Sequence, residues 1–359
     1  MLQPYLDSIN SAVLFFPFAA ALFTFPFLIV QYRRHGYVNK WRGFLLYLFL
    51  LYLICAYFLV LLPFPDSRHN AAPTGSGIQL LPFQFVQDIV REAEVVPGNP
   101  STYVNVLTNF AFLQVVFNVL LTLPFGLFVR YYFRAGLVAC LLASFALSAL
   151  FETTQLTAVF GWFDYPYRVF DVDDLIANTT GGMLGAAAAG VFTRKLPQMD
   201  KLDEDLDLSE KKVTYLRRFV AFAIDYFIWN IPINMLTAWT DVPTPISYLV
   251  ITGLYFLLIP YWTGGFTPGK WLVRMRIAGP DGEPPNLRET FVRGALLYWA
   301  LGGLQILPGL FGSDWIGIAV LMVMLIVNAT FAVHLLIRVF GRKKRLFYET
   351  MSKTKQRIA

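Results

Sequence analysis

Long runs of apolar residues recur along the chain, and each is about as long as a membrane crossing requires. A helix needs roughly 20 apolar residues to cross the hydrocarbon core of a bilayer. Nine segments meet this requirement, at residues 11–30, 43–62, 104–129, 133–153, 169–192, 219–239, 246–263, 294–311 and 315–337. The pattern therefore predicts an all-α, polytopic integral membrane helical bundle with about nine transmembrane helices.

A polar segment separates the fifth apolar run from the sixth. Residues 200–207 read Asp-Lys-Leu-Asp-Glu-Asp-Leu-Asp, which is too highly charged to cross a membrane. We place a domain boundary here, with a five-helix membrane domain at 1–198, an acidic cytoplasmic linker at 199–211 and a four-helix membrane domain at 212–359. No internal repeat relates the two domains, so an inverted-repeat transporter is not suggested.

The composition agrees with a membrane protein. Hydrophobic residues make up 57% of the 359 positions and charged residues 14%, and the mean hydropathy is +0.55. Because soluble domains have roughly a quarter of their residues charged, these values exclude an ordinary soluble domain. The two cysteines, Cys55 and Cys140, each lie inside an apolar run and predict neither a disulfide framework nor a cysteine-based metal site.

Basic residues are divided unequally between the two sides of the predicted membrane. Lys and Arg are retained in cytoplasmic loops during insertion. With the N-terminus outside and the C-terminus in the cytoplasm, 26 of the 29 basic residues face the cytoplasm, and only Arg68, Arg91 and Arg168 lie outside. The division favours this orientation, and it explains the net charge of +6 without nucleic-acid binding.

The outer loop between the second and third predicted helices contains an amphipathic segment. Residues 80–92 place apolar side chains along one helical face behind Pro82, a residue suited to a first helical turn. We expect a short helix on the outer leaflet, which either caps the bundle or takes part in substrate recognition.

Polar side chains gather at the predicted outer ends of the fourth and fifth helices. Glu152 and Gln155 are three residues apart on the fourth helix, and polar residues from Asp171 onward recur at helical spacing on the fifth. Polar groups within membrane helices are costly and need a partner or a function. The candidate ligand-binding residues are Glu152, Gln155, Arg168, Asp171, Asp174, Asn178 and Asn118.

Two interpretations fit these residues. A network between Arg168 and the carboxylates would seal the outer end of the bundle. However, one Arg cannot neutralise several carboxylates, so the remaining negative charge favours a site for a cation, an amine or a polar headgroup. Further along the fifth helix, a row of small residues formed by Gly181, Gly185 and Ala189 predicts close helix packing.

The same region resembles a known family. The sequences LPF at 81–83, LPFG at 123–126, ETTQ at 152–155 and RVFDVDDLIANTTGG at 168–182 follow one another as in the VanZ-like family. The resemblance covers about the first 195 residues and includes the candidate ligand-binding residues as motif positions. It implies a multi-pass protein of the bacterial plasma membrane, linked to low-level resistance to teicoplanin-type glycopeptide antibiotics.

The four-helix domain has charges of its own. Arg218 and Asp225 lie two turns apart at the start of the sixth helix, and a carboxylate buried there must pair with a cation or be protonated. Residues 264–271 have the spacing of a phosphate-binding loop, but Trp271 replaces the required Ser or Thr, and a membrane helix precedes the loop. The alternation of residues 271–277 predicts a short strand at the cytoplasmic surface.

Residues 212–357 resemble the RDD family. Arg218 and Asp225 match its first Arg and Asp, and Lys270 ends its Thr-x-Gly-Lys loop. Glu349 takes the place of the family's second Asp, with the same charge on a longer side chain. The resemblance implies transport or ion exchange and a second polar site formed by these four residues.

We predict a protein that binds or transports envelope lipids or lipid-linked cell-wall precursors, with headgroups at the outer carboxylates. The alternatives are a cation/proton antiporter that uses Asp225 and an envelope-modifying enzyme that uses Glu152 and an Asp as acid and base. The three histidines, His35, His69 and His334, are far apart in the sequence. We therefore assign no catalytic residue, metal or cofactor. The expected partners are membrane lipids, lipid-linked wall precursors or a glycopeptide antibiotic.

Overall fold

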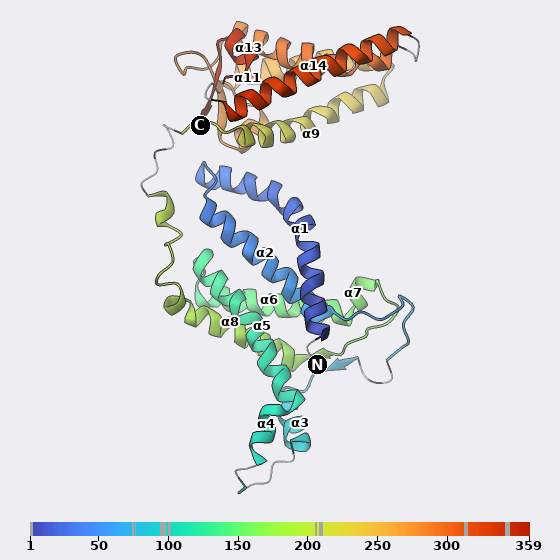
Figure 1. The fold of residues 1–359 in the computed structure, drawn as a ribbon, viewed down its shortest axis with the longest axis vertical. Helices are drawn as coiled ribbons and strands as arrows, with labels where there is room; N and C mark the ends of the chain where they lie inside the picture. Colours follow the sequence, from blue (N-terminus) through green and yellow to red (C-terminus); the bar gives the residue numbers. More distant parts are fainter. Residues whose placement is uncertain are drawn as a thin grey trace. The chain divides into compact units, whose positions relative to one another are not determined.

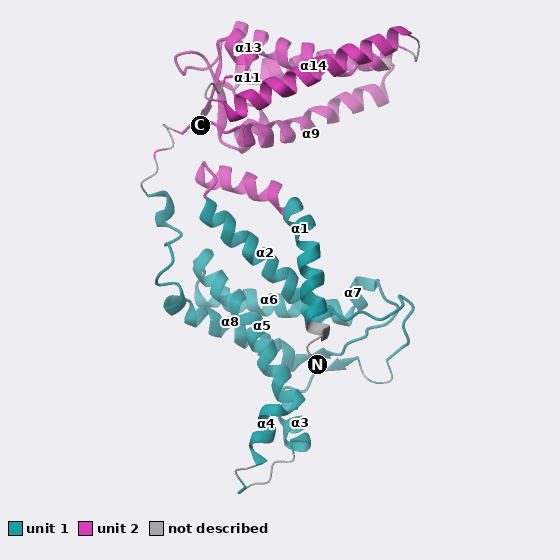
Figure 2. Ribbon diagram, viewed as in Figure 1, with its two compact units in different colours: residues 1–22, 40–204 teal, residues 23–39, 205–359 magenta. Residues whose placement is uncertain are grey.

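A computed structural model of the chain is mostly helical and divides into two compact units. It describes residues 3–359 apart from 74, 76, 94–97, 100–101, 205–206, 208–210, 312–314 and 342–344. Unit 1 comprises Met1–Leu22 and Lys40–Glu204, and unit 2 comprises Phe23–Asn39 and Asp205–Ala359 (Figure 2). Residues 205–206 and 208–210 of the predicted acidic linker lie outside the described residues, and the domain boundaries drawn from the sequence stay predictions.

Unit 1 is built around the long helices α5, α6 and α8, which lie side by side (Figure 1). Its elements in chain order are α1 (Gln3–His35, whose last part belongs to unit 2), α2 (Lys40–Leu61), β1 (Ile78–Gln79), α3 (Gln84–Glu92), α4 (Val104–Thr108), α5 (Phe110–Tyr132), α6 (Leu137–Leu156), α7 (Ala158–Gly161), β2 (Phe170–Asp171), α8 (Val172–Phe192) and the 3-10 turn η2 (Lys201–Asp203).

Unit 2 combines long helices with a short antiparallel sheet, in which β3 pairs with β4. Its remaining elements are α9 (Tyr215–Trp239), α10 (Thr244–Gly253), η3 (Leu254–Leu258), α11 (Ile259–Trp262), α12 (Pro268–Leu272), β3 (Met275–Ala278), α13 (Leu287–Gly294), η4 (Ala295–Gly302), η5 (Gly303–Gln305), η6 (Leu307–Leu310), α14 (Trp315–Phe340), α15 (Phe347–Met351) and β4 (Lys355–Ile358). The strand predicted over 271–277 is confirmed from Met275 onward, whereas its first residues belong to α12.

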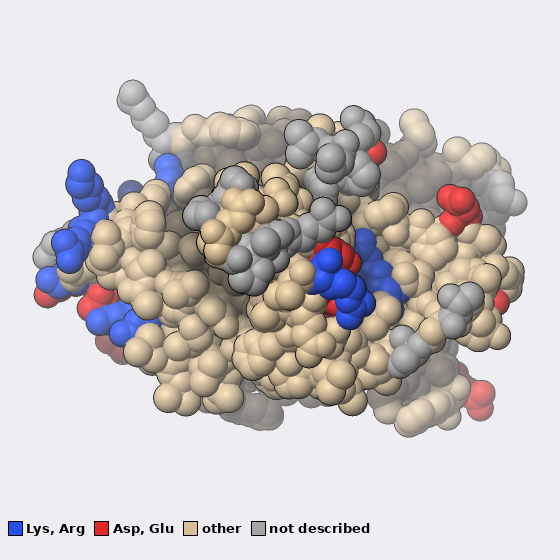
Figure 3. All heavy atoms as spheres, turned by 90° about the horizontal axis from the view of Figure 1, so that it is seen from below, with Lys and Arg blue, Asp and Glu red and all other residues tan. Residues whose placement is uncertain are grey.

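Eight helices within the described part of the chain are long and apolar enough to cross a membrane. They correspond to eight of the nine predicted crossings and confirm an all-α, polytopic membrane protein. Large apolar side chains on these helices, such as Leu22 and Phe340, are exposed, as expected for surfaces that face lipid. On the face in Figure 3, most described side chains are neither acidic nor basic, and charged groups gather in a few places.

The eighth predicted crossing, at 294–311, is helical but irregular. It runs from the end of α13 through the π-helical η4 into the 3-10 turns η5 and η6. The Tyr248 hydroxyl donates a 2.5 Å hydrogen bond to the Tyr298 carbonyl within η4. The adjacent Gly302 leaves room for the Tyr248 side chain, because a Cβ there would collide with the Tyr248 hydroxyl. Local packing against α10 therefore accompanies the departure from a regular helix.

The third predicted crossing is shorter than its apolar run. Asn109 has an extended backbone and separates α4 from α5. Its side chain accepts a hydrogen bond from the Phe112 amide and so caps α5, a role that suits Asn. The membrane-crossing helix therefore begins at Phe110.

Glycines allow the helices of unit 1 to pack closely. A Cβ at Gly181 or Gly185 would collide with backbone carbonyls of α5, and one at Gly182 would collide with Ser144 of α6. The predicted row of small residues thus lies where helices meet, because a larger side chain would force the backbones apart.

In unit 2, one buried arginine joins three stretches of backbone. Arg217 is 2% exposed and donates hydrogen bonds to the carbonyls of Gly36, Val273 and Arg274 over 2.8, 2.7 and 2.6 Å. Arg33, at the end of α1, lies 4.1 Å from the centroid of the Trp271 ring. The segment Phe23–Asn39 is therefore an integral part of unit 2.

Candidate functional site

The polar residues of unit 1 meet where β2 leads into α8. Strand β1 pairs in parallel with β2, which brings Gln79 next to Asp171. Asp171 caps α8 by accepting a 2.8 Å hydrogen bond from the Asp173 amide, and its own amide donates to Glu152 over 3.0 Å. The Gln79 side chain also donates to Asp171 over 3.3 Å. Glu152 and Asp171 are therefore brought together as predicted.

Asp173 connects this region to the loop between α2 and α5, a role that the sequence did not reveal. Its carboxylate accepts hydrogen bonds from the amides of Phe83 and Phe85 over 2.5 and 3.1 Å. These amides belong to the beginning of α3, which starts at Gln84 and has no cap from its own N-cap side chain. Asp173 is 5% exposed, so this attachment is buried. The amphipathic helix is confirmed, but it begins four residues later than predicted.

Asp174 and Asn178 are held by side chains from α5 and α6. Asn118 donates to Asp174 over 2.6 Å. Asn178 donates to Ser148 over 3.1 Å, and its backbone carbonyl accepts a 2.7 Å hydrogen bond from Thr122. The structure thus brings Asn118, Asp174 and Asn178 into one connected polar seam between the helices.

Arg168 and Gln155 make different contacts from those that the sequence suggested. The Arg168 guanidinium donates to the Leu62 carbonyl over 2.9 Å, and the Gln155 amide donates to the Val60 carbonyl over 3.1 Å. Among the described residues, no carboxylate lies within ion-pair distance of Arg168. A seal made of Arg168-carboxylate pairs is therefore not observed.

The carboxylate cluster, formed by Glu152, Asp171, Asp173 and Asp174, is thus held by neutral hydrogen-bond donors. Burial raises the pKa of Asp171, the amide of Asp173 opposes that rise, and the charge of the Asp173 carboxylate adds to it. Within the described residues, no group of three or more His, Cys, Asp or Glu side chains has an arrangement suited to a metal ion.

In unit 2, Asp225 accepts donors on both carboxylate oxygens. Oδ1 accepts from the Tyr255 hydroxyl and the Gly269 amide over 2.8 and 2.7 Å, and Oδ2 accepts from the Thr267 hydroxyl over 2.5 Å. The Lys270 ammonium lies 3.6 Å from Oδ2. Gly269 lies so close to α9 that a Cβ would collide with the Ala221 carbonyl. The Thr-x-Gly-Lys loop therefore wraps the Asp225 carboxylate.

Glu349 forms the second buried ion pair. Its carboxylate lies 3.1 Å from Arg218 and 3.8 Å from Arg293, and it accepts a 3.1 Å hydrogen bond from the Leu346 amide at the start of α15. Arg293, at the end of α13, was not singled out by the sequence. A basic residue in a loop predicted to be cytoplasmic looks like an ordinary orientation signal, so nothing in the sequence pattern distinguished it.

These groups form the charged cluster, defined as Arg218, Asp225, Lys270, Arg293 and Glu349. Three cations face two carboxylates, which leaves one excess positive charge when all five are ionised. Burial lowers the pKa of Lys270, while the neighbouring Asp225 carboxylate opposes that decrease. The cluster is therefore suited to an anion.

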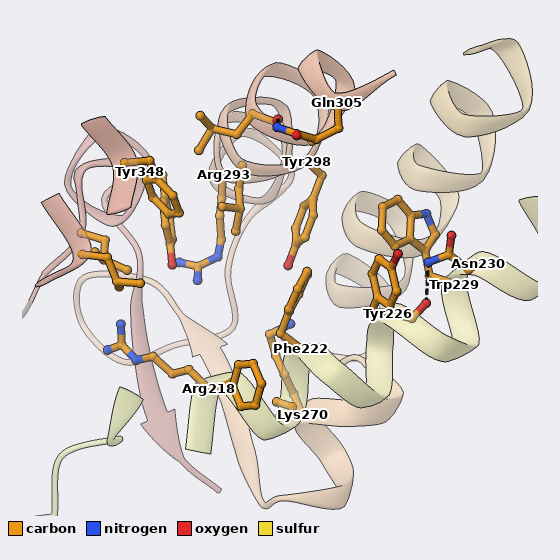
Figure 4. Close-up of a pocket in the computed structure, with 18 of the residues that line it drawn as sticks. Arg218, Phe222, Tyr226, Trp229, Asn230, Lys270, Arg293, Tyr298, Gln305 and Tyr348 are labelled. Atoms are coloured by element: carbon orange, nitrogen blue, oxygen red, sulfur yellow. Dashed lines mark hydrogen bonds between the residues drawn. The ribbon is translucent and has the colours of Figure 1, made fainter. Parts of the chain in front are cut away.

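A cavity of about 900 Å³ extends from the charged cluster between helices of unit 2. Arg218, Lys270 and Arg293 line one end, and Figure 4 shows the rings of Phe222 and Tyr298 facing each other beyond them. Most of the remaining wall is apolar or aromatic and comes from α9, η4 and α14. The cavity thus combines a cationic end with a long apolar body.

Comparisons with known proteins assign a family to each of the two regions. Residues 49–193 match the VanZ/LLP1 family model, and residues 213–348 match the RDD family model. The chain joins a VanZ-like domain to an RDD domain. No curated protein and no solved structure was found to be similar to the chain.

The two domains differ in how well the sequence located their polar groups. In the RDD domain, Arg218, Asp225, Lys270 and Glu349 converge as the family resemblance predicted, and Arg293 joins them. In the VanZ-like domain, five of the seven predicted residues lie in or beside the carboxylate cluster. Gln155 instead bonds to Val60 in the last turn of α2, and Arg168 bonds to Leu62 just after that helix.

Proposed function

We propose that this membrane protein binds and transports anionic amphiphiles of the cell envelope, such as phospholipids or lipid-linked cell-wall precursors, in a bacterial plasma membrane. The observation that carries the proposal is the RDD-domain cavity, which joins a cationic end to an apolar body. A phosphate-bearing headgroup would lie at the charged cluster, and its hydrocarbon chains would follow the apolar walls. A volume of about 900 Å³ is near the upper end of ordinary ligand pockets, roughly 300–1,000 Å³.

A donor without a partner at the cationic end of the cavity supports an anionic ligand. The Nε of Arg218 is buried, and no acceptor for it exists among the described residues. A buried donor without a partner is costly, and a phosphate oxygen would satisfy it. The excess positive charge of the charged cluster also favours an anionic ligand.

The VanZ-like domain suggests the biological setting. Its family is linked to teicoplanin-type resistance, and a protein that binds or relocates lipid-linked wall precursors would change what such an antibiotic can reach. We therefore propose a role in glycopeptide resistance through these lipids. The carboxylate cluster remains a proposed second contact, suited to a cationic or amine-bearing part of a headgroup.

The two alternatives find less support in the geometry. A cation/proton antiporter would need Asp225 to exchange its partner, but both carboxylate oxygens already have protein donors. An envelope-modifying enzyme would use Glu152 and an Asp, and Glu152 is only 1% exposed. We therefore favour a binding and transport protein.

Lipid retention by the purified full-length protein tests the proposal. The protein would be reconstituted with phosphatidylglycerol and phosphatidylcholine, and the lipids that it keeps after detergent exchange would be quantified by mass spectrometry. We expect selective retention of phosphatidylglycerol. Arg218→Gln should weaken retention about 10- to 100-fold, because a hydrogen bond to a charged group contributes about 1.5–3 kcal/mol.

Arg288→Gln is the matched control. Arg288 is exposed, lies on the same helix as Arg293 (α13) and does not line the cavity. Leu301→Trp would fill part of the apolar body without changing any charge, and it should also reduce retention. Inorganic phosphate at millimolar concentration would be added as a competitor, to distinguish a site for free phosphate from a site for a lipid. Equal retention of both lipids, or unchanged retention in Arg218→Gln, would refute the proposal.

A further inference from the structure

Polar groups recur along the whole length of the RDD-domain cavity, well beyond its cationic end. On α9, Arg218, Phe222, Tyr226, Asn230 and Asn234 all line the cavity at intervals of four residues, so they form one stripe. Sixteen residues separate the ends of this stripe, which corresponds to about 24 Å along a helix that rises 1.5 Å per residue. This length is most of the roughly 30 Å thickness of a hydrocarbon core.

The far part of the cavity contains four carboxamide side chains, which we call the amide set. Its members come from α9, η5 and α14, and they are Asn230, Asn234, Gln305 and Asn328. Gln305 and Asn328 exchange hydrogen bonds of 3.0 and 3.2 Å between their side chains. Asn230 donates to the Tyr226 carbonyl over 2.7 Å, as the dashed line in Figure 4 shows.

The amide set favours an occupant that carries polar groups over a purely apolar one. Asn328 lies near the middle of α14, a helix long enough to cross the membrane, so its carboxamide is at the depth of the hydrocarbon core. Gln305 and Asn328 bond to each other and Asn230 donates to a backbone carbonyl, but a hydrocarbon chain could not use the donors and acceptors that these side chains have left. Each carboxamide can donate and accept, which suits the hydroxyl and ester oxygens of a glycerol or sugar headgroup.

We propose that the amide set is a second binding station for a hydroxyl-bearing headgroup, and that the cavity is the path along which this headgroup crosses the membrane. This inference rests on the proposed function and specifies transport in addition to binding. The headgroup moves between the charged cluster and the amide set past the aromatic rings of Phe222 and Tyr298. Figure 4 shows these rings between Arg218 and Arg293 on one side and Trp229 and Asn230 on the other.

The ring of Tyr298 is held in place by its neighbours. It stacks on Phe256 with 3.5 Å between ring centroids, and its backbone carbonyl accepts the Tyr248 hydroxyl. Movement past this point is therefore expected to involve the opposite wall, where Phe222 is 44% exposed.

A transfer assay in proteoliposomes tests the inference. Phosphatidylglycerol with a dithionite-sensitive fluorescent group would be included at low concentration in phosphatidylcholine vesicles that contain the full-length protein. Dithionite quenches the label in the outer leaflet, and the slower quenching phase reports movement from the inner leaflet. We expect the double variant Gln305→Leu/Asn328→Leu to slow this phase at least tenfold while it still retains phosphatidylglycerol.

The double variant removes both members of the hydrogen-bonded pair, so neither is left as an unpaired polar group. Thr330→Val is the matched control, because Thr330 is on the same helix, donates to the Ile326 carbonyl and is not among the described residues that line the cavity. Gln305→Ser/Asn328→Ser should restore part of the rate by returning hydroxyl donors to the path.

Each result bears on the inference. If the double variant transfers lipid like the parent, the Gln305-Asn328 pair only joins helices and the inference is wrong. Loss of retention together with transfer would also overturn it, because the amide set would then be part of one binding site. If the parent retains phosphatidylglycerol but does not move it, the inference fails while the proposed function stands. A parent that retains no anionic lipid overturns both.

Discussion

Replacing Asp173 should release the short helix α3 from the rest of the VanZ-like domain. The Asp173 carboxylate provides acceptors for the amides of Phe83 and Phe85, and the start of α3 has no capping side chain of its own. In Asp173→Ala both amides lose their acceptor. Helix α3 itself has no buried residue among those described, so little apolar burial remains to hold it in place.

The size of the effect follows from these two bonds. A hydrogen bond to a charged group contributes about 1.5–3 kcal/mol, but exposed amides recover part of this from water. Phe83 is 56% exposed, so we expect a total near the lower limit, about 2–3 kcal/mol. Local opening of α3 should then become about 30- to 100-fold more frequent, since each 1.4 kcal/mol is a factor of ten.

Hydrogen exchange followed by mass spectrometry on peptides that cover residues 84–92 measures this opening. Peptides from α5 and α8 should change much less, because their packing does not depend on Asp173. Asp88→Asn is the control, since it removes a charge from α3 and leaves the Asp173 contacts unchanged. An increase below threefold in Asp173→Ala, or an equal increase in Asp88→Asn, would refute the reasoning.

Three further predictions concern other parts of the molecule. Burial raises the pKa of Asp171, so the folded state binds more protons than the unfolded state does. The free energy of unfolding should therefore fall as pH rises from about 4. Asp171→Asn can still cap α8, and its melting temperature should depend less on pH. Gly185→Val should lower the free energy of unfolding by about 1–3 kcal/mol, measured by thermal unfolding. Gly190→Val should not lower it, because a Cβ at residue 190 would have no neighbouring atom within 4 Å. A membrane-impermeant thiol reagent on intact cells should label Ser67→Cys but not Met351→Cys, and the reverse pattern would contradict the predicted orientation.

The membrane architecture was predictable because its cause is local. An apolar run of about 20 residues has few stable alternatives to a crossing helix, so eight predicted crossings appear as long helices. The crossing predicted at 294–311 departs from regularity where it contacts Tyr248, some fifty residues earlier in the chain. No pattern within the segment itself indicates that contact.

The candidate sites were predictable only in part, because contacts of charged side chains depend on distant backbone. Asp173 resembled one more acidic residue in a motif, yet its partners are backbone amides about 90 residues away. Arg168 has a long side chain that can reach several acceptors, and it binds the Leu62 carbonyl. Motif spacing placed the carboxylates of α8 correctly because they share one helix.

The shared use of α1 has a consequence for the order in which the chain folds. The carbonyl of Gly36 leaves the ribosome long before Arg217, its buried partner, is made, because 181 residues separate them. At about 5–20 residues per second, this interval is roughly 10–40 s. During that time the residue that follows α1 lacks the arginine that later binds it. This contact of the RDD domain therefore forms only after the second half of the chain has been made, and a fragment that begins at residue 212 would lack the carbonyl that Arg217 binds.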